Sequence, residues 1–88
     1  MNSARRKIIT ALKAEISAII DQISNLRDDI DQLLTDEQEA FDSRPESLQG
    51  SENGQASEIA MAHLQDAIDL LDNLDLSGVD DLLVEAKS

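Results

Sequence analysis

Residues 8–34, IITALKAEISAIIDQISNLRDDIDQLL, carry the strongest pattern in the chain. Isoleucine recurs every seven residues, and a second large apolar residue follows each isoleucine three positions later. The two rows are Ile9, Ile16, Ile23 and Ile30, and Leu12, Ile19, Leu26 and Leu33. Such an a/d heptad repeat forms one apolar stripe along an α-helix. The stretch therefore predicts a long helix that packs lengthwise against another helix.

Helix-starting and helix-breaking residues set the bounds of the predicted elements. Asn2 or Ser3 can cap the first helix, and no glycine or proline interrupts it before Pro45. Ser77 followed by Asp80 resembles a capping box. The predicted elements are a helix over about residues 3–41, a connector over about 42–54 with one short helical turn at 46–49, a helix over about 55–75, and a short helix over about 78–86.

The second predicted helix carries an apolar row of its own, in which alanine alternates with leucine. Its members are Ala60, Leu64, Ala67, Leu71 and Leu74. When the chain is folded back inside the connector, Leu33 faces Leu64 and Leu26 faces Leu71, so the two rows come into register. This register favours an antiparallel helical hairpin. A parallel two-stranded coiled coil is the alternative, because isoleucine at a with leucine at d also suits that assembly.

The expected fold class is therefore all-α: a coiled-coil-like hairpin with a short third helix, assembling into a four-helix-type bundle. A chain of 88 residues without cysteine buries only a small core by itself. Ile8, Ile20 and Leu34 flank the heptad rows and widen the apolar stripe beyond what one partner helix needs. We expect these three residues to form an interface with other copies of the chain.

The formal net charge of −12 constrains the partners. Direct binding to nucleic acid or to an anionic membrane is disfavoured, because the long-range force is repulsive. A basic protein surface suits this charge, and simple solubility is the other explanation. The candidate contacts to such a partner are Asp28, Asp29, Asp36, Glu39, Asp66, Asp69 and Asp72. The basic residues Arg5, Arg6 and Lys13 are expected to pair with the chain's own Asp80, Asp81 and Glu85.

No arrangement typical of catalysis or metal binding is present. His63 lies three residues before Asp66, but a catalytic triad also needs an activated nucleophile and an oxyanion site. Residues 73–84 imitate the start of an EF-hand loop, yet Val84 stands where the bidentate glutamate is required. We expect a helix-capping turn there, no metal, no cofactor and no enzymatic activity.

The sequence shows no pattern typical of a targeting signal. Thr10, Lys13 and Glu15 interrupt any apolar core of a secretory signal, and no apolar run approaches the length of a membrane span. We expect a cytoplasmic protein that has no membrane contact.

The connector, residues 41–54 with the sequence FDSRPESLQGSENG, resembles a segment of small acidic helical proteins from bacteriophages, prophages and other mobile elements. Those proteins share an aromatic-Asp-Asn-x-Pro-Glu-Ser-Leu-Gln-x-Ser-Glu-x-Gly connector, followed by an acidic helix rich in Ala, Ile and Leu. Ser43 replaces the usual Asn here. The resemblance covers about residues 37–75. It implies a phage or mobile-element origin and action in the cytoplasm of a bacterial host.

Two functional hypotheses follow, and a third, an enzyme or a small-ligand binder, has no catalytic arrangement of residues to support it. The first is a non-enzymatic acidic protein-binding module that inhibits a host defence or nucleic-acid-handling protein by occupying its basic surface. The second is a structural protein whose function is coiled-coil oligomerisation. Salt distinguishes them, because electrostatic capture weakens at high ionic strength while apolar assembly does not.

Overall fold

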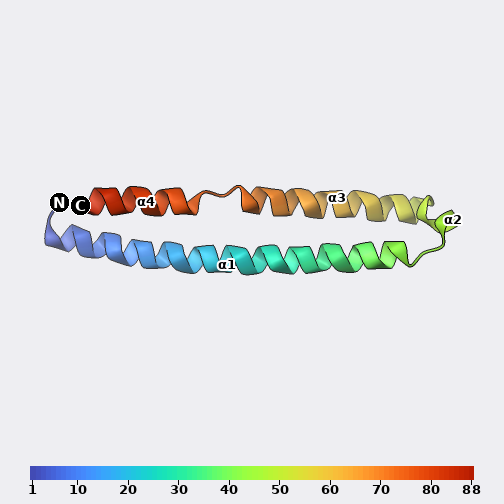
Figure 1. Cartoon of the computed structure of the whole chain (residues 1–88), viewed down its shortest axis with the longest axis horizontal. Coiled ribbons are helices and arrows are strands. Elements are labelled where there is room, and N and C mark those ends of the chain that lie inside the picture. The colour runs from blue at the N-terminus through green and yellow to red at the C-terminus, as the bar shows by residue number, and fades with distance from the viewer. The chain divides into compact units, whose positions relative to one another are not determined.

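The computed structural model describes all 88 residues and consists of helices joined by short turns (Figure 1). The helices are α1 (Ser3–Asp42), α2 (Glu46–Gln49), α3 (Glu52–Asp72) and α4 (Leu76–Lys87). The chain has no strand, so the predicted all-α class is confirmed. No helix combines the length and the apolar run needed to cross a membrane.

Polar side chains fix where the helices begin. Asn2 Oδ1 accepts a hydrogen bond from the amide of Arg5 at 2.8 Å, so Asn2 caps α1. Helix α3 begins at Glu52, earlier than predicted, because the Ser51 hydroxyl accepts from an amide of its first turn. Helix α4 also begins early, at Leu76. The predicted cap at Ser77 is wrong, since Asp75 supplies the capping carboxylate.

The chain divides into two units, which are described separately. The connector unit is Leu26–Asn73, and the terminal unit is Met1–Asn25 together with Leu74–Ser88. Helix α1 contributes its second half to the connector unit and its first half to the terminal unit.

Within the connector unit, α1 and α3 run antiparallel (Figure 1). Arg27 contacts Asp72 at the end of α3, whereas Glu37, further along α1, contacts Ser57 near the start of α3. Leu33 and Leu64 line the same groove, as the predicted register requires. Ile68 is the buried centre of this unit, with only 1% of its surface exposed.

The side of α1 that faces α3 differs from the prediction. The least exposed positions of α1 in the connector unit follow steps of three and four residues and are Arg27, Ile30, Leu34, Glu37 and Phe41. They are the a and e positions of the heptad. The d positions Leu26 and Leu33 are 50% and 54% exposed. A single partner helix covers only part of a wide apolar stripe, and here it covers the a/e side.

The facing row of α3 is shifted in the same way. The residues with the least exposure are Gly54, Ser57, Met61, Leu64, Ile68 and Leu71. The predicted row shares Leu64 and Leu71 with it, and its Ala67 is half-buried, but Ala60 is exposed. This alanine side of α3 and the leucine side of α1 are therefore left without a covering helix.

Within the terminal unit, the first half of α1 lies beside α4. Ile9 is the buried residue of this unit, at 7% exposure, and Lys87 Nζ donates a hydrogen bond to Thr10 Oγ1 at 2.8 Å. The predicted ion pairs between the basic N-terminal residues and the acids of α4 do not form, because every ion pair in the structure involves Arg27. Only two hydrophobic residues, Ile9 and Ile68, are buried in the whole chain.

Candidate functional site

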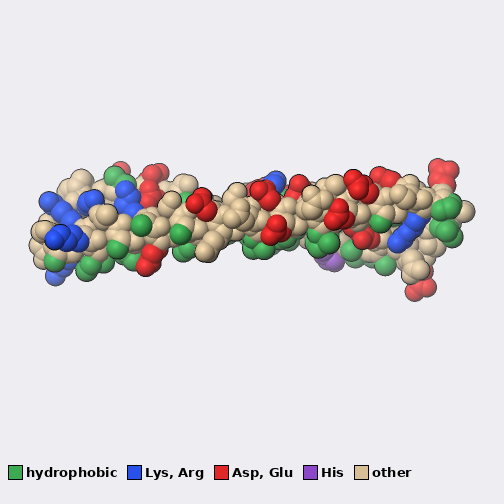
Figure 2. Space-filling model, turned by 90° about the horizontal axis from the view of Figure 1, so that it is seen from below, with side chains coloured by type: hydrophobic (Ala, Val, Ile, Leu, Met, Phe, Trp, Pro, Cys, Tyr) green, Lys and Arg blue, Asp and Glu red, His purple; other side chains and the backbone are tan.

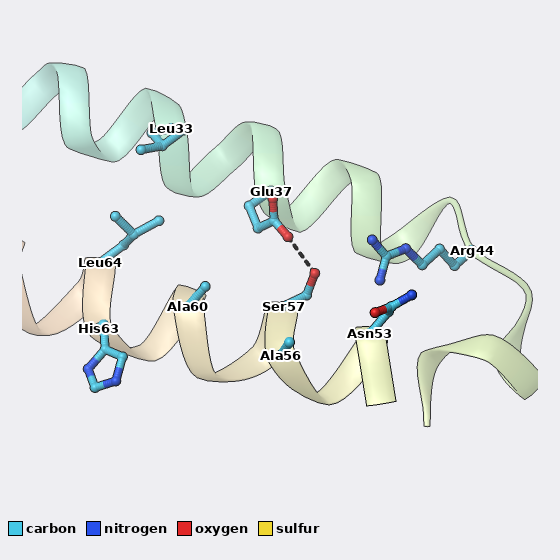
Figure 3. A pocket seen from close by; sticks show the side chains of 9 residues that line it. All are labelled: Leu33, Glu37, Arg44, Asn53, Ala56, Ser57, Ala60, His63 and Leu64. Carbon is cyan, nitrogen blue, oxygen red and sulfur yellow. Dashed lines mark hydrogen bonds between the residues drawn. The ribbon is translucent and has the colours of Figure 1, made fainter. Parts of the chain in front are cut away.

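An open groove of about 620 Å³ follows one side of α1 and α3 in the connector unit (Figure 3). Leu33 and Leu64 lie at the end away from the connector, and Arg44 and Asn53 lie at the connector end. The apolar lining consists of Leu33 from α1 and of Ala56, Ala60 and Leu64 from α3. The polar lining consists of Glu37, Arg44, Asn53, Ser57 and His63.

The apolar character of this side extends beyond the groove. Leu26 lies one heptad before Leu33, and Ala67 lies seven residues after Ala60, so helical periodicity places each beside its counterpart. The antiparallel arrangement carries both extensions in the same direction. Figure 2 shows hydrophobic side chains gathered beside the histidine along one edge of the view. We call this side the apolar face and define it by Leu26, Leu33, Ala56, Ala60 and Ala67.

A polar contact joins α1 and α3 across the groove. The Ser57 hydroxyl donates a hydrogen bond to the Glu37 carboxylate (Figure 3). Ser57 is 6% exposed, so this bond satisfies a buried hydroxyl that would otherwise be costly. Arg44 directs its guanidinium between Glu37 and Asn53, and its Nη1 is buried without a hydrogen-bond partner.

The connector itself is held by hydrogen bonds from a side chain to backbone carbonyl groups and by one close approach of two helices. Gln49 Nε2 donates hydrogen bonds to the carbonyls of Phe41 at 3.3 Å and of Arg44 at 3.1 Å. Gly54 lies against the end of α2, where an added Cβ atom would be 2.0 Å from the carbonyl oxygen of Gln49. Only glycine allows this approach, so Gly54 determines how α2 and α3 meet.

The opposite side of the connector unit has a different lining. A shallow hollow of about 480 Å³ is lined mainly by polar residues of α1 and by Met61, Ala62 and Gln65 of α3. Ala62 lies two positions after Ala60 on the same helix, and both alanines are exposed. One alanine thus lines each side, which provides a matched pair for mutation.

One ion pair joins the two helices of the connector unit. Arg27 Nε donates to Asp72 Oδ1 at 2.7 Å, and a second guanidinium nitrogen lies 3.8 Å from Asp28 Oδ1. The hydrogen bond that Arg27 donates to Asp72, together with the negative charge of Asp72, raises the pKa of Arg27. Both side chains of the Arg27–Asp72 pair are partly exposed, so solvent screens much of their attraction.

The seven predicted acidic contacts all belong to the connector unit. Arg27 brings Asp28 and Asp72 together across α1 and α3. Asp36 accepts from Gln32, and Asp69 accepts from Gln65, within their own helices. The remaining three are exposed without an ion pair: Asp29, Glu39 and Asp66. The structure thus presents them as separate surface charges.

The three predicted interface residues lie in different surroundings. Ile8 and Ile20 are exposed in the terminal unit, whereas Leu34 is half-buried and lines the hollow opposite the apolar face. The prediction missed Leu26 and Leu33 as open positions, because an a/d repeat assigns both rows to the hairpin seam. The alternation of Ala with Leu on the second helix was the signal that a second neighbour can approach closely there.

The arrangement contains no cluster of three or more metal-binding side chains. His63 is exposed at the margin of the groove, and no hydrogen bond joins it to Asp66. In the EF-hand-like segment, Asp75 accepts from the Gly78 amide at 2.7 Å and serves as the cap of α4. The chemistry that the groove supports is therefore apolar packing with a polar end.

Comparisons with protein-family models, with curated proteins and with solved structures find no match for this chain.

Proposed function

We propose that this chain is a non-enzymatic helical interaction module whose connector unit docks another helical surface on its apolar face. The observation that carries the proposal is the half-exposed leucine row of α1, Leu26 and Leu33, beside the alanine row of α3. Small residues let a second backbone approach closely, and the leucines supply apolar area for it to cover.

The energetics of the connector unit support docking. Burial of apolar surface contributes about 25 cal/mol per Å², yet Ile68 is the only buried hydrophobic residue of this unit. Covering Leu26 and Leu33 would add burial that the isolated chain lacks. An uncovered apolar face rimmed by charged residues is typical of an interaction site.

A matched pair of variants tests the proposal. Ala60→Arg places a long charged side chain in the apolar face, and Ala62→Arg places it on the opposite side of the same helix. Each variant is immobilised in turn, and the chains that it captures from solution are compared with those captured by the wild-type protein. We expect Ala62→Arg to capture the same chains and Ala60→Arg to lose them. Equal capture by both variants, or none by the wild type, would contradict docking on this face.

The acidic surface supports a second candidate function, capture of a basic protein. The connector unit holds thirteen of the nineteen acidic residues but only two of the seven basic ones, Arg27 and Arg44. This surface is suited to occupy a basic nucleic-acid-binding site. With the phage-like connector, we infer an inhibitor of a host defence or nucleic-acid-handling protein that acts in the bacterial cytoplasm.

Charge neutralisation tests this second candidate. We expect the triple variant Asp29→Asn, Glu39→Gln and Asp66→Asn to lose a basic partner that the wild-type protein retains at low salt, because these carboxylates are exposed and have no ion pair. Ala60→Arg should retain the same partner. A partner that is lost with Ala60→Arg but retained by the triple variant would assign the interaction to the apolar face.

A further inference from the structure

Most of the positive charge of the chain gathers at one end of the terminal unit (Figure 2). The first fourteen residues contain four basic residues and no acidic one, and α4 adds a fifth basic residue in its last turn. We call this cluster the basic end and define it by Arg5, Arg6, Lys7, Lys13 and Lys87. None of the five forms an ion pair. The basic end is therefore a positive surface on a chain whose other charges are mostly negative.

The packing of α4 explains why these cations stay unpaired. Lys87, the last residue of α4, bonds to Thr10, so the three basic residues that precede Thr10 lie about one turn beyond the end of α4. Asp80 and Asp81 line a hollow with Ser17, two turns further along α1. The cations also oppose the dipole of α1, whose first turn has no acidic residue. An external anion is therefore the partner that suits this charge.

Exposed apolar side chains accompany the basic end. Ile8 is 58% exposed and Leu12 is 41% exposed. These two residues are four positions apart, and Arg5 lies three positions before Ile8, so all three share one face of α1. A helix segment that combines clustered basic side chains with exposed large apolar ones is typical of contact with a membrane surface.

We infer that the basic end binds an anionic lipid surface. Its cations contact the phosphate groups of the lipid heads, while Ile8 and Leu12 enter the boundary between the headgroups and the acyl chains. Nucleic acid fits less well, because its phosphate backbone offers no partner to the exposed apolar side chains. This surface belongs to the terminal unit, so the inference does not depend on the proposed function, which concerns the connector unit.

The net charge of −12 does not prevent this contact. Repulsion between the whole chain and an anionic membrane is expected only if the charge is evenly spread, whereas thirteen of the nineteen acids belong to the connector unit. That unit begins on α1 at Leu26, nineteen positions after Lys7, which is about 28 Å of helix. The Debye length at physiological ionic strength is about 8 Å. The acids nearest in sequence, Glu15 and Glu85, are outnumbered by the five cations.

Sedimentation with lipid vesicles tests the role of charge. We expect the full chain to bind vesicles that contain phosphatidylglycerol, to bind pure phosphatidylcholine vesicles far more weakly, and to be released by high salt. Each basic residue near an anionic surface strengthens binding about fivefold. Arg6→Gln should therefore bind about fivefold more weakly, and Arg6→Gln with Lys7→Gln about 30-fold more weakly. The matched control Arg27→Gln, which removes the same charge from the connector unit, should bind as the wild type does.

The apolar contribution distinguishes a lipid surface from other phosphates. Ile8→Ser should weaken binding to the anionic vesicles about tenfold, because its exposed surface would enter the lipid. Leu70→Ser is the control, since Leu70 is 72% exposed but belongs to the connector unit, and it should not change binding. Inorganic phosphate at the concentration of the lipid phosphate should not compete. Circular dichroism checks that each variant keeps its helices.

Four results would overturn the inference. They are the absence of binding to the anionic vesicles, equal binding to both kinds of vesicle, equal loss with Arg6→Gln and Arg27→Gln, and binding that Ile8→Ser leaves unchanged. Duplex DNA that binds the chain more tightly than the vesicles do, with no effect of Ile8→Ser, would also overturn it and assign the basic end to nucleic acid. None of these results bears on the apolar face, so the proposed function is tested separately.

Discussion

The connector unit and the terminal unit use the same long helix but stabilise its pairing differently. The connector unit joins α1 to α3 through an ion pair and a buried serine–glutamate hydrogen bond, and it holds α2 against α3 through the close approach at Gly54. In the terminal unit, one exposed hydrogen bond joins α1 to α4, between Lys87 and Thr10, beside the buried Ile9.

Charge separates the two units even more clearly. The connector unit has thirteen acidic and two basic residues, whereas the terminal unit has the remaining six acidic and five basic residues. Nearly all of the net charge of −12 therefore lies on the connector unit. The acids of the connector unit repel one another, and its specific polar contacts hold the helices in place against that repulsion. The same unit bears both surfaces of the proposed function.

The largest expected effect concerns the two buried isoleucines. Ile68→Ala should lower the free energy of unfolding by about 4 kcal/mol, because it leaves a cavity at the centre of the connector unit. Ile9→Ala should cost about 2 kcal/mol, since the terminal unit near the chain ends can close around the smaller side chain. Urea denaturation followed by circular dichroism, at one chain concentration, measures both. Equal losses would remove this difference between the units.

The next effect concerns the glycine at the connector. Gly54→Ala should cost about 2–3 kcal/mol, because the new Cβ would collide with the Gln49 carbonyl and force α2 away. Gly50→Ala is the control, since a Cβ there meets nothing within 4 Å, and it should change stability by less than about 0.5 kcal/mol. If the melting temperature shifts equally in both variants, the contact at Gly54 does not determine how α2 packs against α3.

A smaller effect is expected at the polar end of the groove. Ser57→Ala should cost about 1 kcal/mol, because it removes the hydroxyl that donates to Glu37. Thr10→Ala, which removes the exposed hydrogen bond of the terminal unit, should change stability by less than about 0.5 kcal/mol. A double-mutant cycle with Glu37→Leu isolates the coupling. No coupling between Ser57 and Glu37 would show that the bond does not stabilise the connector unit.

The smallest effect is expected at the surface ion pair. Arg27→Gln should lower the melting temperature slightly at low salt and not at high salt, because the pair with Asp72 is partly exposed. Asp72 raises the pKa of Arg27, so the contribution of the guanidinium is present below the ordinary arginine pKa and is lost only as pH rises through the raised value. Raising the pH from neutral to mildly basic should leave the difference between Arg27→Gln and wild type unchanged.

Local sequence signals predicted the helices well. The run of good helix formers without glycine or proline predicted α1 to within one residue of its end. Pro45 and its neighbours predicted the short helix α2. Cap positions were less certain, since Ser51 and Asp75 compete with nearby polar residues that are equally able to cap. Antiparallel pairing within the connector unit followed from the register of Leu33 with Leu64.

The sequence by itself determined that the chain is helical and strongly acidic. It also determined that the apolar stripe of α1 is wider than one partner helix covers. Only the tertiary structure decided that α3 covers the a/e side of α1 and leaves Leu26, Leu33 and the alanine row open. The physical reason is that a heptad repeat specifies a stripe and not the angle at which a neighbour approaches it. That angle is set by contacts between residues far apart in the sequence, such as Ser57 with Glu37 and Arg27 with Asp72, that form only when the helices are packed.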